Sequence, residues 1–268
     1  MSSSLIPAER RRLICELARS QGIVKVADLS RQLGVSEITV RRDLEALEQE
    51  DVLERTHGGA IYSQRMRAEP LYTEKDRIHR REKLAIGRAA AMLVEENDTL
   101  LVNSGSTTLQ VIRHLQTSSQ RGLKIITSNM GKLASDWSSD QELLLVGGTF
   151  RQTSNSLVGP WAIMALKQIN ANKAFIGVDG ISARYGLTTP ILQEAEIARM
   201  MIERTHGPVI VVADHSKVGV VADFVTVSAD KVDILVTDDG FDEGYRVELE
   251  ERDVEIIIAT TEPVASCQ

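Results

Sequence analysis

The segment Ser36-Glu-Ile-Thr-Val-Arg-Arg-Asp-Leu44 decides how the N-terminal part of the chain folds. Gly34 and Val35 precede it and predict a tight turn, after which the Ser36 hydroxyl can accept an otherwise unpaired amide of the first helical turn. Val40, Leu44 and Leu47 recur at the spacing of one buried helical stripe. The opposite face carries Ile38, Arg42, Glu45 and Gln49, flanked by Thr39 and Arg41. We therefore expect an amphipathic helix with two arginines on its outer side.

The flanking patterns fit a winged helix-turn-helix over residues 1–62. A first amphipathic helix begins near Pro7, where proline is tolerated. A short edge strand follows at residues 24–26, and then a second helix with Leu29 and Leu33 inward. Two short β runs around Gly58-Gly59 predict a hairpin. In this fold the helix at 36–49 enters the major groove and the hairpin lies beside the DNA backbone. The alternative is a small helical bundle without a DNA role, in which Arg41-Arg42 is only a solvated face.

Charge in this region is sorted along the helix. Residues 1–62 carry nine Lys/Arg and ten Asp/Glu, so the region is near neutral. Arg41 and Arg42 lie in the first two turns, whereas acidic residues crowd the end; we expect only those turns to enter the groove. Either arginine can contact guanine, and Ile38 or the Thr39 methyl can touch a thymine methyl. Few basic groups predict weak binding by one subunit and cooperation at repeated half-sites.

Three motifs resemble the DeoR family of bacterial transcription regulators. They are Arg10-Arg11-Arg12-Leu13-Ile14, Ser36-x-x-Thr39-Val40-Arg41-Arg42-Asp43-Leu44 and Arg55-Thr56-His57-Gly58-Gly59-Ala60. The resemblance implies double-stranded operator DNA as a partner. The predicted DNA-contacting residues are Ser36, Glu37, Ile38, Thr39, Arg41, Arg42 and His57.

Length, charge and composition limit the class of protein to which this chain can belong. A length of 268 residues favours two domains, and a net charge of −7 argues against nonspecific coating of nucleic acid or attraction to an anionic membrane. The longest apolar runs have strand length, and the N-terminus lacks an apolar signal core, so we expect a cytoplasmic protein without a membrane partner. Two lone cysteines make no disulfide framework, and the histidines lack zinc-ligand spacing with them. We expect no metal and no cofactor.

Residues 63–82 are polar and charge-rich, contain Pro70, and are interpreted as a linker. A helix then runs to about Val94, with a small-residue face that includes Ala85, Ala89 and Ala90. This helix either carries a signal between domains or only packs on the core.

Residues 83–268 are predicted to form a larger α/β domain with a largely parallel sheet, because strand and helix patterns alternate. The expected strands are 99–102, 124–127, 143–146, 173–178, 209–213, 231–236 and 254–258. The expected helices are 109–115, 132–137, 162–168 and 195–205. Ligands of such sheets bind at the carboxyl ends of the strands.

Five polar clusters fall at those strand ends. They are 103–108, Ser128-Asn129, 147–151 with 154–156, 177–180, and 214–217. The first opens a helix after a Gly/Ser/Thr turn, as in a phosphate cradle, or is an ordinary turn. Lys217 and Arg151 can meet a phosphate, and Asp179 can hold sugar hydroxyls. The structural alternative is an ion pair that involves Lys217 and Asp179.

These segments resemble the DeoR-type sensor domain, which is similar in fold to ribose-5-phosphate isomerase A. The resemblance implies a phosphorylated sugar or sugar derivative as effector, with the phosphate at residues 104–108 and the sugar near Asp179, Glu194 and Lys217. The predicted effector-binding residues are Ser104, Gly105, Ser106, Thr107, Thr108, Asn129, Arg151, Asp179, Glu194 and Lys217.

A rival hypothesis is an active sugar-phosphate isomerase fused to a DNA-binding module. Its acidic run Asp-Gly-Ala-Asp-Glu is reduced here to Val178-Asp179-Gly180-Ile181, and its Lys-Gly-Gly-Gly run is absent, with Lys217-Val218-Gly219 the nearest match. Glu194 remains a candidate base. We favour a binding-only site with no catalytic residue, because a fold does not confer chemistry. A third hypothesis is a constitutive architectural DNA-binder whose second domain only oligomerises.

The sequence thus predicts a cytoplasmic transcription repressor of carbohydrate-metabolism genes, controlled by a phosphorylated sugar. We expect a homo-oligomer, either dimer or tetramer, that assembles mainly through the α/β domain.

Overall fold

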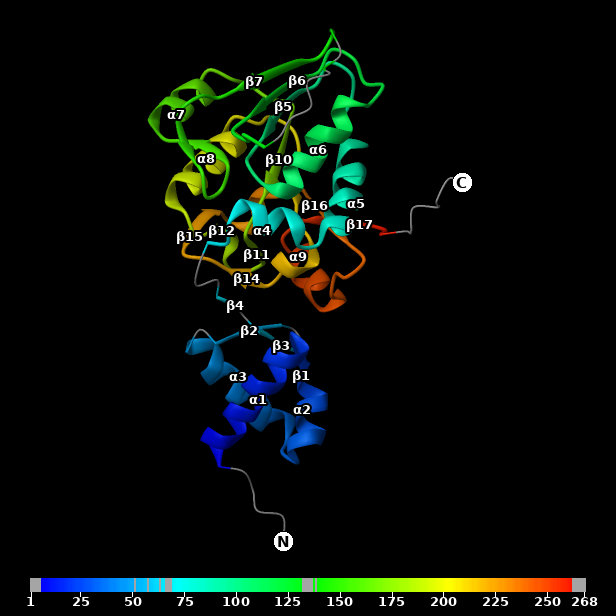
Figure 1. Ribbon diagram of the computed structural model, residues 1–268. Helices are drawn as coiled ribbons and strands as arrows, with labels where there is room; N and C mark the ends of the chain where they lie inside the picture. Colours follow the sequence, from blue (N-terminus) through cyan, green and yellow to red (C-terminus); the bar gives the residue numbers. More distant parts are fainter. Residues whose placement is uncertain are drawn as a thin grey trace. The chain divides into compact units, whose positions relative to one another are not determined.

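The computed structural model describes residues 6–50, 52–56, 58–62, 64–65, 69–131, 137 and 139–261. The chain divides into two compact units, Met1–Arg65 and Met66–Gln268. Figure 1 colours both along the sequence. The first unit contains α1 (Pro7–Gln21), β1 (Ile23–Lys25), α2 (Val26–Leu33), α3 (Glu37–Gln49), β2 (Leu53–Arg55), β3 (Gly59–Tyr62) and β4 (Gln64–Arg65).

The first unit is a helix-turn-helix with an antiparallel sheet, which confirms the predicted fold class. Strands β1 and β2 pair on either side of β3. Gly34 ends α2 in the left-handed conformation, with φ 65°, and this turn leads into α3. The core joins the three helices through buried residues that include Ile14, Leu29, Val40 and Leu44. Val26 begins α2 rather than ending the edge strand, and β1 lies one residue earlier than the predicted strand 24–26.

The glycine pair of the hairpin serves strand packing as well as the turn. A Cβ placed on Gly59 would lie 1.9 Å from the backbone oxygen of Val24, on the paired strand. No side chain fits that distance, so β1 and β3 reach this register only with glycine here.

A buried ion pair joins α1 to α3. Arg10 Nη2 donates to Asp43 Oδ1 at 3.1 Å, and Arg10 Nε donates to Asp43 Oδ2. The two side chains are only 8% and 7% exposed. The hydrogen bond with Asp43 raises the pKa of Arg10. Removal of either partner leaves a buried charge without its counterion.

The second unit begins with α4 (Tyr72–Arg77) and α5 (Arg80–Ala91). Its strands are β5 (Thr99–Val102), β6 (Lys124–Thr127), β7 (Glu142–Leu145), β8 (Thr149–Arg151), β9 (Ser156–Val158), β10 (Lys173–Gly177), β11 (Gly180–Ser182), β12 (Gly186–Thr189), β13 (Val209–Val212), β14 (Val220–Val221), β15 (Phe224–Val227), β16 (Ile234–Asp238) and β17 (Glu255–Ala259). The further helices are α6 (Ser106–Gln116), α7 (Pro160–Leu166), α8 (Leu192–Glu203) and α9 (Arg246–Glu250), with 3-10 turns η1 (His215–Lys217), η2 (Ala229–Lys231) and η3 (Glu243–Tyr245).

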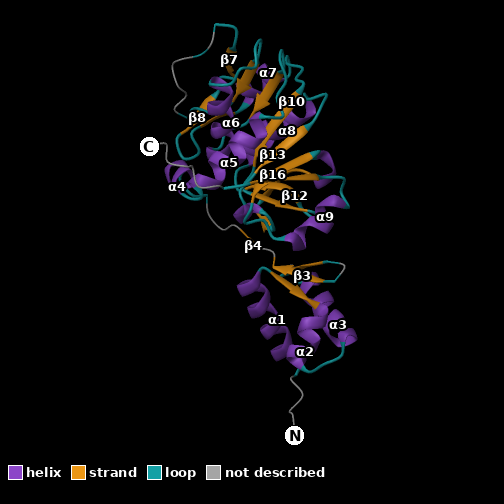
Figure 2. Cartoon of the chain, turned by 90° about the vertical axis from the view of Figure 1, so that its right-hand side faces the viewer, coloured by secondary structure: helices purple, strands orange, loops and turns teal. Residues whose placement is uncertain are grey.

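A seven-stranded parallel sheet forms the centre of this unit, in the order β17-β16-β13-β10-β5-β6-β7. Alternate side chains of its strands enter two cores: Leu100 and Phe175 pack with α5 and α6, whereas Leu101 and Ile176 pack with α7 and α8. Helices therefore cover both faces (Figures 1 and 2). Strand order reverses between β5 and β10, and the carboxyl ends of strands separate at such a point.

The segment expected as a linker contributes structure to the second unit. Residues 72–77 form α4, which the sequence analysis did not find because six residues after a proline show no clear period. The helix expected to run to about Val94 is α5, which begins at Arg80 directly after His79, with φ 51°, and ends at Ala91.

The sheet strands lie within a few residues of their expected positions, but β16 begins at Ile234 because η2 occupies Ala229–Lys231. The small antiparallel sheet β11-β12-β15 and the β8-β9 pair were not expected. Most of the expected helix 132–137 lies outside the described residues.

We predict that Asp43→Ala destabilises the first unit by about 3–5 kcal/mol, because Arg10 would remain buried without its carboxylate. Hydrogen exchange of amides 6–62 in the full chain measures this, since both tryptophans, Trp137 and Trp161, lie in the second unit.

Asp28→Ala is the matched control. Its partner Arg31 is 80% exposed, so the expected change is within about 0.5 kcal/mol. Equal effects of the two variants would contradict a stabilising role of the buried pair. The double variant Arg10→Met/Asp43→Leu should recover most of the lost protection.

Candidate functional site

The N-terminal end of α3 presents the predicted DNA-contacting side chains. Ser36 caps the helix, and its Oγ accepts the Thr39 amide at 3.3 Å. Ile38 is 67% exposed, and Arg41 and Arg42 are exposed as well. A large apolar side chain beside two arginines in the first two turns is the arrangement that base-edge contacts require.

Ion pairs of the first unit partly neutralise its acidic groups. Arg55 of β2 lies 3.6 Å from Glu45 and 3.9 Å from Glu48, at the acidic end of α3. Glu37 and Arg41 form an exposed ion pair, in which Arg41 Nη2 lies 3.7 Å from Glu37 Oε2. Arg42 forms no ion pair with any described residue, and its guanidinium remains available. His57 lies outside the described residues.

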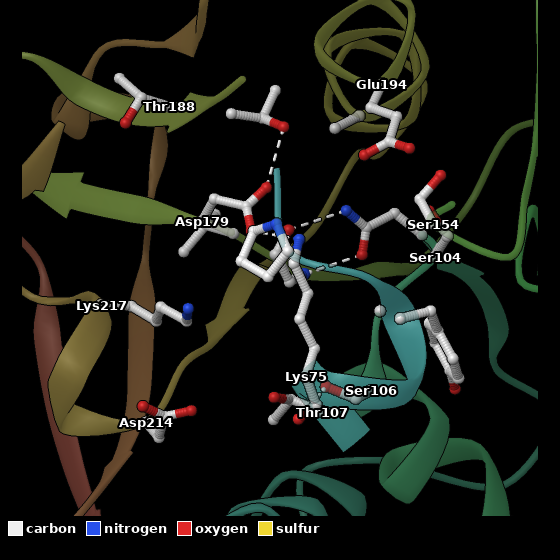
Figure 3. Close-up of a pocket in the computed structure, with 18 of the residues that line it drawn as sticks. Lys75, Ser104, Ser106, Thr107, Ser154, Asp179, Thr188, Glu194, Asp214 and Lys217 are labelled. Atoms are coloured by element: carbon white, nitrogen blue, oxygen red, sulfur yellow. Dashed lines mark hydrogen bonds and ion pairs between the residues drawn. The ribbon is translucent and has the colours of Figure 1, made fainter. Parts of the chain in front are cut away.

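The second unit contains a pocket at the carboxyl ends of β5, β6, β10 and β13 (Figure 3). Its volume is about 120 Å³, roughly ten times what one water molecule needs. Ten of the 26 lining residues carry a hydroxyl group, and α4, α5, β12 and α8 complete the wall. The polar and charged lining residues include Tyr72, Lys75, His79, Lys83, Asn103, Ser104, Ser106, Thr107, Ser128, Ser154, Asp179, Thr188, Thr189, Glu194, Asp214, Ser216, Lys217 and Thr226.

Asn103 fixes the edge where strand order reverses. Its Nδ2 donates to the Gly177 carbonyl at 2.8 Å, and its Oδ1 accepts the Gly177 amide at 2.7 Å. This side chain thereby joins the ends of β5 and β10. The first turn of α6 follows directly, and Ser104, Gly105, Ser106 and Thr107 all line the pocket. Amides of a first helical turn have no partners within the helix and favour an anion.

Thr108 faces away from the pocket and supports the turn. Its Oγ1 donates to the carbonyls of Asn103 and Gly105, at 2.9 and 3.1 Å. Asn129 is also buried behind the lining, where its Nδ2 donates to the Gly105 carbonyl at 2.9 Å and its Oδ1 accepts the Gly131 amide. Both residues shape the cradle rather than line it.

Asp179 pairs with a lysine that the sequence analysis did not single out. Lys75 Nζ of α4 lies 2.6 Å from Asp179 Oδ1, and Thr189 Oγ1 donates to Asp179 Oδ2 at 3.0 Å. Asp179 therefore forms an ion pair, as the structural alternative expected, but its partner is Lys75 rather than Lys217. No sequence signal pointed to Lys75, because it lies in a segment without a regular period.

Lys83 is the most deeply buried cation of the pocket, at 5% side-chain exposure. Its ammonium donates to the carbonyls of Lys75, at 2.6 Å, and Ile78, and lies 3.7 Å from Asp214 Oδ2. Burial lowers the pKa of Lys83, Asp214 opposes this, and Lys217 adds to it. The sequence analysis did not single out Lys83.

The side chain of Lys217 has no hydrogen bond or ion pair with a described residue, and it extends toward the space beside Lys75 and Asp179 (Figure 3). Three polar atoms of the lining are buried without a hydrogen-bond partner: Tyr72 Oη, Ser128 Oγ and Asp214 Oδ2. Burial also raises the pKa of Tyr72 to about 12. These atoms are therefore available for hydrogen bonds with a molecule in the pocket.

Arg151 does not line the pocket. Its guanidinium contacts Glu69 at 2.9 and 3.1 Å and Glu194 at 2.7 Å. The hydrogen bond with Glu69 raises the pKa of Arg151. Glu194 reaches the pocket wall, but its Oε1 also accepts from Ser156 at 3.1 Å. A phosphate would therefore have to compete with the carboxylates of Glu69 and Glu194 for the Arg151 guanidinium.

The described ranges contain neither a cluster of metal ligands nor a membrane-spanning helix. No group of three or more His, Cys, Asp or Glu side chains there is placed to hold a metal ion. No helix in those ranges has the length and apolar character needed to cross a membrane.

Comparisons with known proteins match both units. A family model described as "DeoR-like helix-turn-helix domain" matches residues 10–66, and one described as "DeoR C terminal sensor domain" matches residues 78–239. The HTH-type transcriptional regulator GlpR of Haloferax volcanii is 33% identical over 254 residues, which cover 94% of this chain and 98% of that protein. Transcriptional repressor AccR of Agrobacterium fabrum is 32% identical over 236 residues, with coverages of 87% and 90%.

Among solved structures, ribose 5-phosphate isomerase A from Methanocaldococcus jannaschii is similar over 52% of this chain and 55% of that one. The sequence identity is 17% and the TM-score is 0.38. The likeness spans about half of the isomerase and is too low to support an argument about function.

We predict that Lys83 makes the stability of the second unit rise with pH on the alkaline side. The folded state binds its proton more weakly than the unfolded state, whose lysine pKa is about 10.4. Between the lowered folded pKa and that value the unfolded state holds more protons, so raising the pH favours folding. Below the folded pKa this contribution does not change with pH.

Urea unfolding followed by tryptophan fluorescence at several pH values measures the effect. Lys83→Met should remove the rise, whereas the exposed control Lys167→Met should keep it. Identical pH profiles for the two variants would contradict the assignment.

Proposed function

The chain belongs to the DeoR family of transcription regulators, and we propose that it is a sequence-specific DNA-binding repressor of carbohydrate-metabolism genes. On this proposal a phosphorylated sugar or sugar derivative binds the pocket of the second unit and controls the affinity for operator DNA. The observation that carries it is the pocket wall itself, where a helix N-terminus and the unpaired Lys217 meet a hydroxyl-rich surface.

The DNA half of the proposal rests on the first two turns of α3. Arg42 has no competing ion pair among the described residues, and Ile38 is exposed beside it. Arg10 is buried with Asp43 and Arg55 lies near acidic groups, so few cations of this unit remain for phosphates. Weak binding by one subunit favours a cytoplasmic homo-oligomer, a dimer or tetramer, on half-sites spaced by helical turns.

The effector half rests on complementary charge. A phosphoryl dianion at Ser104–Thr107 would accept the first-turn amides of α6 and the hydroxyls of Ser106 and Thr107. Lys217 supplies a cation on the same pocket. Carboxylates at Asp179 and Glu194 accept hydroxyl protons, so they suit the polyol part of such a molecule.

The hydrogen bonds of Glu194 fit a binding site without catalysis better than the active site of an isomerase. A base that moves protons must present an available oxygen to the substrate. Glu194 Oε1 already accepts hydrogen bonds from both Arg151 and Ser156. We therefore propose a sensor rather than an enzyme, and turnover of ribose 5-phosphate above background would contradict that part.

We predict that Arg42→Ala weakens binding to DNA upstream of the chain's own gene by about 5- to 150-fold, because one base-reading side chain typically contributes about 1–3 kcal/mol. Fluorescence anisotropy at one fixed salt concentration measures the affinity. The control Arg246→Ala, in the second unit, should bind as the wild type does. A loss of phosphosugar binding with DNA binding intact would reverse the assignment of the two units.

We predict that Thr107→Glu abolishes the response of DNA binding to every sugar phosphate while DNA binding itself persists, because the carboxylate repels a phosphoryl group at the α6 N-terminus. A titration of the DNA complex with pentose and hexose phosphates measures the response. Thr117→Glu, at the exposed opposite end of α6, is the matched control and should respond normally. A normal response of Thr107→Glu would place the phosphate elsewhere.

A further inference from the structure

Two charged contacts tie the start of the second unit to acidic groups of the pocket wall. The tied segment is 69–77, which we call the connector; residues 67–77 lie between the ranges that the two family models match. Its first described residue, Glu69, follows Arg65, the end of the first unit, by four positions. Any displacement of the connector therefore acts on the chain that leads to the DNA-binding unit.

The first tie is Lys75 on Asp179. The Nζ–Oδ1 distance is 2.6 Å, and the side chains are 18% and 10% exposed, so solvent screens the pair only in part. Both residues line the pocket (Figure 3). A phosphorylated polyol in this space would bring hydroxyl donors beside Asp179. They would compete with Lys75 for its carboxylate.

The second tie runs from Glu69 through Arg151 to Glu194. Arg151 makes two parallel contacts with the Glu69 carboxylate, at 3.1 and 2.9 Å, and one contact with Glu194 at 2.7 Å. Of these three residues, only Glu194 lines the pocket. A ligand hydroxyl that donates to Glu194 competes with Arg151, whose guanidinium would then keep its contacts with Glu69 and Ser154.

Other contacts of the connector involve no pocket acid directly. The Tyr72 amide donates to the Thr153 carbonyl at 2.8 Å, and Lys83 holds the carbonyls of Lys75 and Ile78. These bonds keep α4 on the second unit while the two charged ties change. The backbone of the connector is thus held at Tyr72 and at Lys75, whereas the side chains of Glu69 and Lys75 depend on the pocket acids Glu194 and Asp179.

We propose that Glu69 and Lys75 are positioning residues that couple ligand binding in the pocket to the connector. The ligand competes with Lys75 for Asp179, and it competes with Arg151, the partner of Glu69, for Glu194. This inference rests on the proposed function and adds the residues that connect its two halves. Ligand binding releases both ties together, and the connector then exchanges between two arrangements with different DNA affinity.

The test uses the full chain and variants that break one tie each. Glu69→Gln removes the second tie without changing a pocket-lining residue, and Lys75→Met removes the first. Lys75→Arg keeps the charge and serves as the conservative rescue. Glu95→Gln is the matched control, since Glu95 is 82% exposed and its partner Lys173 keeps Asp98.

Two measurements are made without ligand: hydrogen exchange of amides 69–78, and affinity for DNA upstream of the chain's own gene. Glu69→Gln and Lys75→Met should exchange faster than the wild type and shift the DNA affinity by about fivefold or more. The control and Lys75→Arg should match the wild type. In the wild type, pentose and hexose phosphates should speed exchange of the same amides, whereas inorganic phosphate, which lacks hydroxyl-bearing carbons, should not.

Three results overturn the proposal. Unchanged exchange in both variants would mean that these contacts do not hold the connector. Faster exchange with unchanged DNA affinity would mean that the connector does not control DNA binding. Faster exchange in the wild type with inorganic phosphate alone would assign the effect to charge rather than to competition for the acids. If the wild type shows no sequence-specific DNA binding, the proposed function is overturned instead. Hydrogen exchange of amides 69–78 then still decides whether the two charged contacts hold the connector.

Discussion

The reversal of strand order between β5 and β10 is the constraint on which the pocket depends. The two strands pair in parallel, yet their following segments leave toward opposite sides of the sheet. The Asn103 side chain occupies the resulting gap and bonds to both backbone groups of Gly177. Because that edge is fixed, the first turn of α6 and the Asp179 carboxylate meet around one space.

Charges within the pocket are largely matched before any ligand arrives. Lys75 pairs with Asp179, Lys83 lies beside Asp214, and Arg151 contacts Glu194. Such pairing limits the desolvation penalty of burying these groups together. Lys217 is the exception among the described lining residues, and with the helix N-terminus it leaves the pocket suited to one additional anion.

In the first unit, ion pairs occupy cations that would otherwise be available to bind phosphates. Arg10 stabilises the packing of α1 on α3, and Arg55 offsets the acidic end of α3. Cations that support the fold are not available to phosphates, so the DNA-facing charge is concentrated at Arg41 and Arg42. A small, localised positive surface favours base contacts over nonspecific attraction to the backbone.

The sequence by itself determined the elements whose signals are local. Ser36 with the stripe Val40, Leu44 and Leu47 predicted α3, and apolar runs placed β5 and β6 at their observed bounds, because periodicity and capping depend on near neighbours. The polar strand ends at 103–107 and 177–179 were likewise visible, since parallel strands bring such ends to one edge. Only the tertiary structure decided which charges meet: Lys75 reaches Asp179 across 104 positions, and Arg151 reaches Glu69 across 82. Ion pairs between distant residues leave no period in the sequence, so Lys75, Lys83 and the true partners of Arg151 emerged only from the fold.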